Sequence, residues 1–369
     1  PDTLMNDPTG PMARQILFSI GMVELISYWK IACPPRVEIR CGNLKEEQIS
    51  FWLDLYYGGL GEFFYINNIP AKKEDFMIIE IAPDTEVTSN VEAEEAAFHA
   101  SGKTLIPIGG GKDSVVTVEH LKGKGHNVAF GINPTKASLD TMDIGGFGQE
   151  DRFIVKRTLD PEMLRLNQEG YLNGHTPFSA LLAFVAYYGA YVLGATHIAL
   201  SNEASANAST IPGTDINHQY SKTSEFERAF RSYTERFLEP DIHYFSLLRP
   251  FAEIAIARSF ASYPAYHKAF RSCNRGSKKN IWCCACSKCL FVYTILAPFL
   301  SREDMVEIFG EDLFAKEDLL DDWQKLIGVQ EVKPFECVGT VEEVQFAVYL
   351  LLKGAEKKVD DLPLLLREA

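Results

Sequence analysis

The chain has 369 residues, of which 46% are hydrophobic and 23% charged, a composition typical of a globular protein with a sizeable core. Its formal net charge of −14 argues against a general polyanion-binding surface, so we expect a soluble small-molecule substrate and no nucleic acid partner. Five of its eight cysteines lie between Cys273 and Cys289, which indicates a metal site in a reducing cytoplasm rather than a disulfide framework.

The N-terminal part, residues 1–90, has the pattern of a smaller α+β unit. A pair of prolines, Pro34-Pro35, ends its first helical segment. An acidic, alanine-rich segment then leads to the next part of the chain. Apolar periodicity predicts helices over 13–30, 46–57 and 86–102, and strands over 37–41 and 77–81.

Residues 105–119 are typical of a buried strand, a tight turn and the start of a helix. The glycines of the turn let backbone N–H groups approach a ligand closely, and a helix N-terminus favours negative charge. This pattern predicts a phosphate or pyrophosphate site, the alternative being an ordinary glycine-rich turn. The residues expected to form it are Gly109, Gly110, Gly111, Lys112, Asp113 and Ser114.

The glycine loop does not fit the Walker pattern. It resembles the PP-loop of the ATP pyrophosphatase superfamily, whose pattern is Ser-Gly-Gly-x-Asp-Ser, with Gly109 in place of the first serine. The resemblance implies ATP as the ligand. We expect Lys112 to neutralise developing phosphate charge and Asp113 to position the loop or its Mg²⁺.

Strand and helix patterns alternate after the glycine loop. This predicts an α/β fold over 91–300 with a doubly wound parallel sheet of the PP-loop type, followed by a helical region over 301–369. The uncharged stretch 176–196 is long enough to span a membrane, but its polar residues and two glycines favour a buried helix. Strands are expected over 128–132, 153–155, 198–200 and 244–247, and helices over 161–170, 176–193 and 225–237.

The cysteine cluster has the spacing of a tetrahedral zinc site. Cys283, Cys286 and Cys289 are separated by two residues each, and Cys273 lies ten positions upstream of the first. Cys284 is an alternative to Cys283. An all-thiolate set predicts a closed, structural Zn²⁺ site, and a similar grouping accompanies the PP-loop in the deazaguanine synthases.

Basic residues lie inside the cysteine-rich loop, and Arg275 is our candidate among them for binding substrate phosphates. The alternative is a solvated basic loop. Its other basic residues are Arg271, Lys278 and Lys279.

Polar residues follow the strand expected over 198–200. Ser201, Asn202 and Glu203 stand where nucleotide contacts are expected in such a sheet. Glu203 is a candidate to hold Mg²⁺ or to contact the adenosine hydroxyls. A helix-capping segment is the alternative, because serine and asparagine are good caps.

Two further polar segments and one cysteine complete the candidate site. In 217–222, His218 is a candidate for acid–base work and Lys222 for binding a phosphate or carboxylate. Cys337 is a candidate proton-transfer thiol, or else a small core residue. Further substrate-binding candidates are His175, Tyr220 and Ser221.

Together these segments resemble the ATP-dependent epimerases that act on UDP-N-acetylmuramoyl-L-alanyl-L-glutamate in bacterial cell-wall synthesis. The resemblance spans most of the chain. It rests on Tyr28-Trp29-Lys30, Pro34-Pro35, Gly58-Gly59-Leu60-Gly61-Glu62-Phe63, the glycine loop, Asn173-Gly174-His175, Ser201-Asn202-Glu203, residues 217–222, the cysteine cluster and Pro334-Phe335-Glu336-Cys337-Val338-Gly339.

The resemblance implies that ATP is cleaved to AMP and pyrophosphate while the terminal L-glutamate is inverted through an acyl-adenylate. His218 and Cys337 are the expected pair of acid–base groups. One rival interpretation is a PP-loop amide- or thiol-transferring enzyme that adenylates a nucleoside or transfer RNA, as the deazaguanine synthases do. The other is a non-catalytic nucleotide-binding module, which the intact Lys112-Asp113-Ser114 disfavours.

Overall fold

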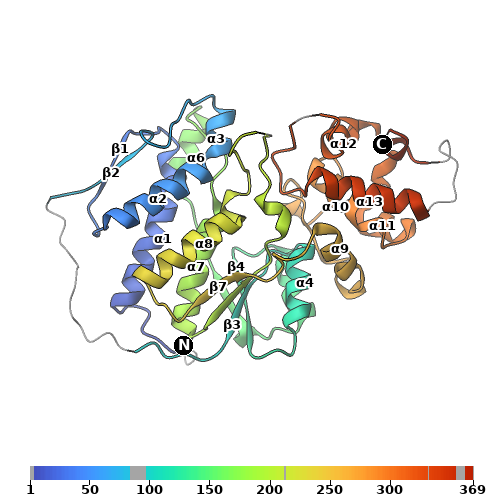
Figure 1. Cartoon of the computed structure of the whole chain (residues 1–369). Helices are drawn as coiled ribbons and strands as arrows, with labels where there is room; N and C mark the ends of the chain where they lie inside the picture. Colours follow the sequence, from blue (N-terminus) through green and yellow to red (C-terminus); the bar gives the residue numbers. More distant parts are fainter. Residues whose placement is uncertain (1–3, 84–96, 212, 331, 355–361, 369) are drawn as a thin grey trace. The chain divides into compact units, whose positions relative to one another are not determined.

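The computed structural model describes residues 4–83, 97–211, 213–330, 332–354 and 362–368 (Figure 1). The chain forms two compact units. The three-part division at residues 90 and 300 stays a prediction. Unit 1 comprises Pro1–Leu105, Lys156–Ile198 and Asp215–Phe245, and unit 2 comprises Ile106–Val155, Ala199–Thr214 and Ser246–Ala369.

A five-stranded sheet has the order β5-β4-β3-β6-β7. β3 pairs with β6 and β4 with β5, both in parallel. The chain proceeds from β3 to one edge and then returns to β6 and the other edge, so the order reverses beside β3. Loops that leave parallel strands at such a reversal are the usual place for a ligand. The strands are β3 (Thr104–Pro107), β4 (Asn127–Ile132), β5 (Arg152–Val155), β6 (His197–Leu200) and β7 (His243–Ser246).

Unit 1 consists mainly of helices around an aromatic core. Trp52 of α2 stacks on Phe184 of α7 with ring centroids 5.1 Å apart, and Phe184 meets Phe230 of α8 edge-on at 4.8 Å. This packing fixes the position of α2, whose C-terminal end leads into the site described below. The elements are α1 (Pro11–Trp29), β1 (Arg36–Ile39), α2 (Glu46–Gly59), α3 (Gly61–Ile66), β2 (Ile78–Ile81), α6 (Pro161–Gln168), α7 (Phe178–Leu193) and α8 (Ser224–Phe237).

Unit 2 has a core centred on α10 (Ser287–Leu296), in which every residue except Lys288 is buried. Helices α9, α11, α12 and α13 pack against α10. The remaining helices of this unit are α4 (Lys112–Leu121), α5 (Lys136–Gly145), α9 (Glu253–Ala261), α11 (Arg302–Phe309), α12 (Leu320–Leu326), α13 (Val341–Gly354) and α14 (Leu364–Arg367).

Most of the expected elements are confirmed, and the fold is α/β. The finer doubly wound, PP-loop type of sheet stays a prediction. The helix expected over 86–102 is wrong over 97–102, where hydrogen bonds from Ser101 to Gly194 O and between His99 and Asn6 hold irregular backbone. Residues 86–96 lie outside the described residues. The sequence patterns also do not predict α3, α5, α9 and α10.

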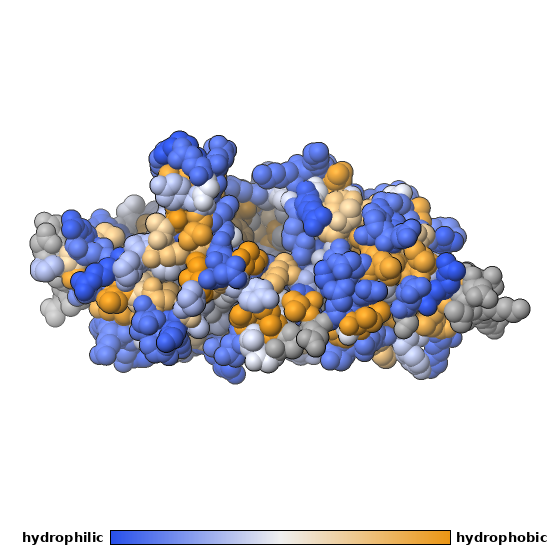
Figure 2. All heavy atoms as spheres, turned by 90° about the horizontal axis from the view of Figure 1, so that it is seen from above, coloured by the Kyte–Doolittle hydropathy of each residue, from blue (hydrophilic) through white to orange (hydrophobic). Residues whose placement is uncertain are grey.

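Hydrophilic and hydrophobic residues are interspersed on the face drawn in Figure 2. The uncharged stretch 176–196 forms α7, most of which is buried, as expected. Among the described residues there is no helix with the length and apolar character needed to cross a membrane.

Candidate functional site

The glycine loop follows β3, and α4 begins directly after it at Lys112. Gly110 has φ of +82°, and a Cβ there would lie 2.6 Å from the backbone N of Ser138. Only glycine tolerates both this conformation and this close approach. None of the described side chains caps α4, so its first backbone N–H groups suit an anion.

Lys112 lies deeper than the sequence suggests, because its side chain is only 1% exposed and its ammonium contacts the carboxylates of Asp113 and Glu253. Burial opposes the charge, but Asp113, Glu253 and Glu203 together raise the pKa of Lys112. Burial raises the pKa of Glu253, whereas the positive charge of Lys112 lowers it. One ammonium therefore holds a group of acidic side chains, and a direct contact with phosphate would need part of this network to open.

The segment after β6 offers polar groups to a ligand. The hydroxyls of Ser201 and Ser205 are buried without a hydrogen-bond partner among the described residues. Asn202 donates to Ser246 Oγ at 3.0 Å, and the Glu203 carbonyl accepts from Arg249 at 2.7 Å. Leaving a buried hydroxyl without a hydrogen bond costs roughly 1–3 kcal/mol of folding free energy. A ligand that accepts or donates hydrogen bonds here would recover that cost, and the sheet order places a ligand site at this edge.

Four cysteines of unit 2 come together as the spacing predicts. The sulfurs of Cys273, Cys283, Cys286 and Cys289 all lie within 4.8 Å of one another. Cys283 and Cys289 are 3.7 Å apart and Cys286 and Cys289 3.5 Å, close to the roughly 3.8 Å between thiolates that each bind zinc at about 2.3 Å. Cys284 Sγ instead lies 3.2 Å from the carbonyl of Phe309. The donor set and its size fit Zn²⁺.

A cavity of about 690 Å³ lies next to this cluster in unit 2. Arg275 and Ser287, which stand between zinc-ligand candidates, line it together with Lys325, Lys333 and Glu336. Its charged lining fits a polar ligand. Arg275 also donates to the carbonyl of Ala285 at 2.9 Å, which ties its side chain to the cysteine-rich loop.

Cys337 is half-buried in unit 2, and its carbonyl accepts a hydrogen bond from Lys288 Nζ. The neighbouring Glu336 accepts a hydrogen bond from Asn274 at 3.0 Å. Cys337 thus lies on a segment fixed to the cysteine-rich loop and α10. His218, its expected partner in proton transfer, belongs to unit 1.

In unit 1 the structure assembles a cluster of one carboxylate and two imidazoles. Nδ1 of His218 forms a hydrogen bond with Glu62 Oε2, and Nδ1 of His175 lies 3.6 Å from the same oxygen. The two imidazole rings are 4.5 Å apart between centroids. Their side chains are 10%, 22% and 14% exposed for Glu62, His175 and His218, so the cluster is largely shielded from water.

The charges around this cluster are mostly positive. Burial, followed by His218, lowers the pKa of His175 to about 4, and Lys30 and Lys222 act in the same direction. Lys30 is buried and donates to Thr176 Oγ1 at 2.9 Å and to the Gly174 carbonyl, which fixes the loop that carries His175. An anionic substrate is therefore a better match for this region than a cation.

Glycines at the end of α2 explain how three separate segments meet at Glu62. A Cβ on Gly58 would lie 2.6 Å from the ring of Tyr220, in the segment that carries His218. A Cβ on Gly59 would lie 2.7 Å from Pro177, two residues after His175. Both loops can approach the start of α3 only because these positions have no side chain.

The remaining predicted substrate-binding residues lie in a 3₁₀ turn. In it the Ser221 side chain is buried and Tyr220 packs on Gly58. Lys222 Nζ donates to Gln219 Oε1 at 3.3 Å, and Thr223 caps α8. Tyr220 and Ser221 therefore contribute packing in this turn, whereas Lys222 contributes charge.

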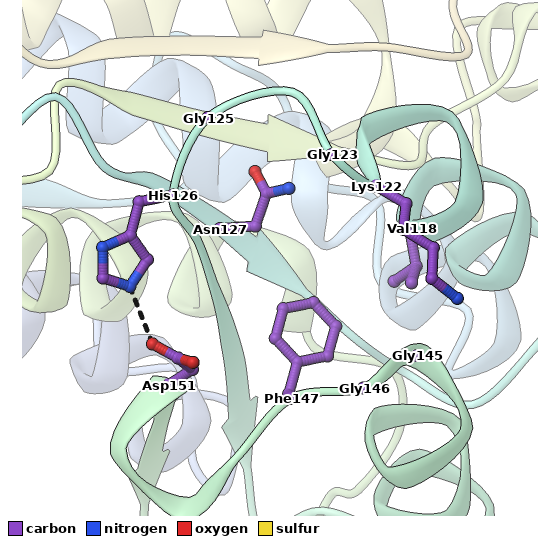
Figure 3. A pocket seen from close by; sticks show the side chains of 10 residues that line it. All are labelled: Val118, Lys122, Gly123, Gly125, His126, Asn127, Gly145, Gly146, Phe147 and Asp151. Carbon is purple, nitrogen blue, oxygen red and sulfur yellow. Dashed lines mark hydrogen bonds and ion pairs between the residues drawn. The ribbon is translucent and has the colours of Figure 1, made fainter.

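Another cavity, of about 420 Å³, is lined by residues at and after the C-terminal end of α4, whereas the glycine loop precedes its N-terminus. Figure 3 shows the side chains that line this cavity. His126 Nε2 is 2.7 Å from Asp151 Oδ1 there, but the His126 side chain is 54% exposed. None of the residues predicted from the sequence to form the site lines this cavity.

Sequence reasoning missed Glu253, Glu62 and Lys30 as site residues. Glu253 lies on the unexpected helix α9, and no local pattern links it to Lys112. Glu62 was visible only as part of the segment Gly58-Gly59-Leu60-Gly61-Glu62-Phe63, in which three glycines precede a carboxylate.

Comparisons with known proteins agree along the chain. The family model described as the MurL N-terminal domain matches residues 3–247, and that described as the MurL C-terminal domain matches residues 269–366. Proteins from Xanthomonas oryzae and Micromonospora are each 34% identical over 94% of this chain and 76% of their own length. A Salinispora tropica protein is 34% identical over 93% and 76%. All three are named UDP-N-acetyl-alpha-D-muramoyl-L-alanyl-L-glutamate epimerase. No solved structure matches the chain.

Proposed function

The chain belongs to the MurL family, and we propose that it inverts the α-carbon of the terminal L-glutamate of UDP-N-acetylmuramoyl-L-alanyl-L-glutamate, a precursor of peptidoglycan. The observation that carries the proposal is that both family domains match in order and together account for most of the chain. Sharing about a third of its residues with three epimerases over nearly its full length supports a shared substrate.

We propose further that the reaction is driven by ATP. The α-proton next to a carboxylate is very weakly acidic, because its removal places a second negative charge on an anion. Adenylation of the carboxylate removes that charge and releases pyrophosphate. One group can then take the proton from one face, and another can return a proton to the other face. Hydrolysis of the acyl-adenylate then releases AMP and the inverted product.

The ATP site is proposed at the glycine loop of unit 2. The backbone N–H groups at the start of α4 would bind phosphate, and the unpaired hydroxyls of Ser201 and Ser205 would contact the nucleotide. Lys112 would hold Asp113 and Glu253 in place, and Asp113 with Glu203 would hold Mg²⁺ if the network opens. Magnesium would neutralise charge on the phosphates.

The four cysteines, Arg275, His218 and Cys337 keep their predicted roles in this proposal. The four thiolates would hold a structural Zn²⁺ that folds the cysteine-rich loop. Arg275, with Lys325 and Lys333 in the adjacent cavity, would bind the diphosphate of the nucleotide sugar. His218 and Cys337 would exchange protons at the α-carbon.

The proposal is tested by incubating the purified protein with ATP, Mg²⁺ and the UDP-muramoyl dipeptide. The product is then hydrolysed to its amino acids, and chiral analysis should find D-glutamate. AMP and pyrophosphate should form in parallel. An unchanged L-glutamate, or AMP formation that depends on a nucleoside instead of the dipeptide, would count against an epimerase.

A further inference from the structure

We infer that Glu62, His218 and His175 form a proton-transfer site in which His218 alone exchanges the proton, Glu62 positions it, and His175 stays neutral. The inference rests on the proposed epimerase function. It adds two residues to the reaction, Glu62 and His175, and gives the two histidines different roles.

The geometry fixes the tautomer of His218. An ionised carboxylate only accepts hydrogen bonds, so the bond between Glu62 Oε2 and His218 Nδ1 is donated by the ring. A neutral imidazole that donates from Nδ1 carries its lone pair on Nε2, the atom that can then take a proton. A carboxylate in this position also stabilises the imidazolium that forms, as in other carboxylate–histidine pairs.

Glu62 forms a hydrogen bond with His218 but not with His175. His175 Nδ1 is 3.6 Å from Glu62 Oε2, which is beyond a hydrogen bond. Two imidazolium rings with centroids 4.5 Å apart would repel each other over a single carboxylate. Burial and the charges of His218, Lys30 and Lys222 disfavour the protonated form of His175, and together they outweigh Glu62, which favours it. His218 is therefore the ring that can hold the extra proton.

A metal ion is the competing interpretation of the cluster, because one ligand atom from each of Glu62, His175 and His218 lies within 4.8 Å of the others. The charges nearby favour proton transfer, because Lys30 and Lys222 both make the region positive and so disfavour a cation.

Nε2 of His218 takes the α-proton of the acyl-adenylate, and the electron pair of the broken C–H bond stays on the substrate, delocalised into its carbonyl. A second acid returns a proton to the opposite face of the carbon. The imidazolium of His218 then loses its proton to water. If His218 lies on the opposite face of the α-carbon, the second group removes the proton and the imidazolium of His218 donates one.

The experiment uses the full chain with ATP, Mg²⁺ and the UDP-muramoyl dipeptide in D₂O, and compares His218→Gln, Glu62→Gln and His175→Gln. Pyrophosphate exchange into ATP reports adenylation, and D-glutamate and α-deuterium report proton transfer. His126→Gln is the matched control, because His126 also pairs with a carboxylate, Asp151 (Figure 3), but is exposed and follows the C-terminal end of α4.

We expect His218→Gln to lower kcat for inversion by about 10²- to 10⁴-fold with pyrophosphate exchange retained. Glu62→Gln should lower kcat by about 10- to 100-fold with little change in KM, and should increase the isotope effect of α-deuterated substrate, because proton abstraction becomes slower. His175→Gln should lower kcat by less than about tenfold.

The inference is overturned if His175→Gln and His218→Gln lower kcat equally, if Glu62→Gln changes only KM, or if purified protein loses an equivalent of bound metal on His218→Gln. These outcomes differ from failure of the proposed function, in which the unmodified protein itself would neither invert glutamate nor exchange pyrophosphate.

Discussion

The two candidate regions have opposite charge arrangements. In unit 2 one ammonium, that of Lys112, is surrounded by the carboxylates of Asp113 and Glu253, with Glu203 acting on it from nearby. In unit 1 one carboxylate, that of Glu62, is surrounded by bases.

The difference suggests a division of chemistry between the regions. A buried lysine among acids suits the fixing of the glycine loop, where we propose that ATP and Mg²⁺ bind. A buried carboxylate beside two imidazoles suits the orientation of a base. Substitutions that affect one region should therefore leave the step assigned to the other region intact.

The largest effect is expected from Lys112→Ala. It should abolish pyrophosphate exchange and also lower the free energy of unfolding by about 3–5 kcal/mol, because it leaves Glu253 buried without its partner. The sequence does not indicate this loss of stability, because no local pattern places Lys112 in the core. The double variant Lys112→Ala, Glu253→Gln should recover stability but not exchange. Wild-type exchange in the double variant would remove Lys112 from ATP binding.

The second-largest effect is expected at the cluster of Cys273, Cys283, Cys286 and Cys289, which we expect to hold one Zn²⁺ per chain. Cys286→Ser should abolish zinc binding and unfold the cysteine-rich loop, because a structural zinc site contributes directly to folding. Cys284→Ser is the matched control, since its sulfur lies against the Phe309 carbonyl instead of in the cluster. Elemental analysis that finds equal zinc in the two variants would contradict the assignment.

Cys337→Ala should lower inversion by about 10²- to 10⁴-fold while pyrophosphate exchange continues. The thiol would supply the proton-transfer group for the face opposite to His218. With one group left, α-deuterium should still enter one epimer of the substrate without net inversion. Full epimerase activity in this variant would return Cys337 to the role of a core residue.

A smaller effect concerns pH and stability. The pKa of His175 is lowered from 6.5 to about 4, so between these values the unfolded chain binds more protons than the folded chain. The stability from a neutral His175 is complete above about pH 6.5 and declines as the pH falls towards 4, by at most about 3 kcal/mol. His175→Gln should lose less stability than the wild type between pH 7 and 4.5 in urea unfolding. An equal loss in both proteins would mean that His175 is not held neutral.

How much the sequence could predict also differs between the two regions. The glycine loop and the cysteines are local patterns, so the strand, the turn, α4 and the four sulfurs could be predicted from spacing. Glu253 could not, because a buried ion pair between residues 141 apart in sequence leaves no local signal. In unit 1 each histidine could be named, but their meeting at Glu62 depends on close packing against Gly58 and Gly59.

We propose that ATP activates the substrate at the glycine loop before His218 and Cys337 exchange its α-proton, and deuterium incorporation tests this proposal most directly. The wild-type protein is incubated in D₂O with the UDP-muramoyl dipeptide, with and without ATP, and the glutamate α-carbon is analysed by mass spectrometry and NMR. The account predicts one α-deuterium in the D-glutamyl product and none in the reaction without ATP. Deuterium that enters without ATP, or inversion that proceeds without deuterium, would contradict it.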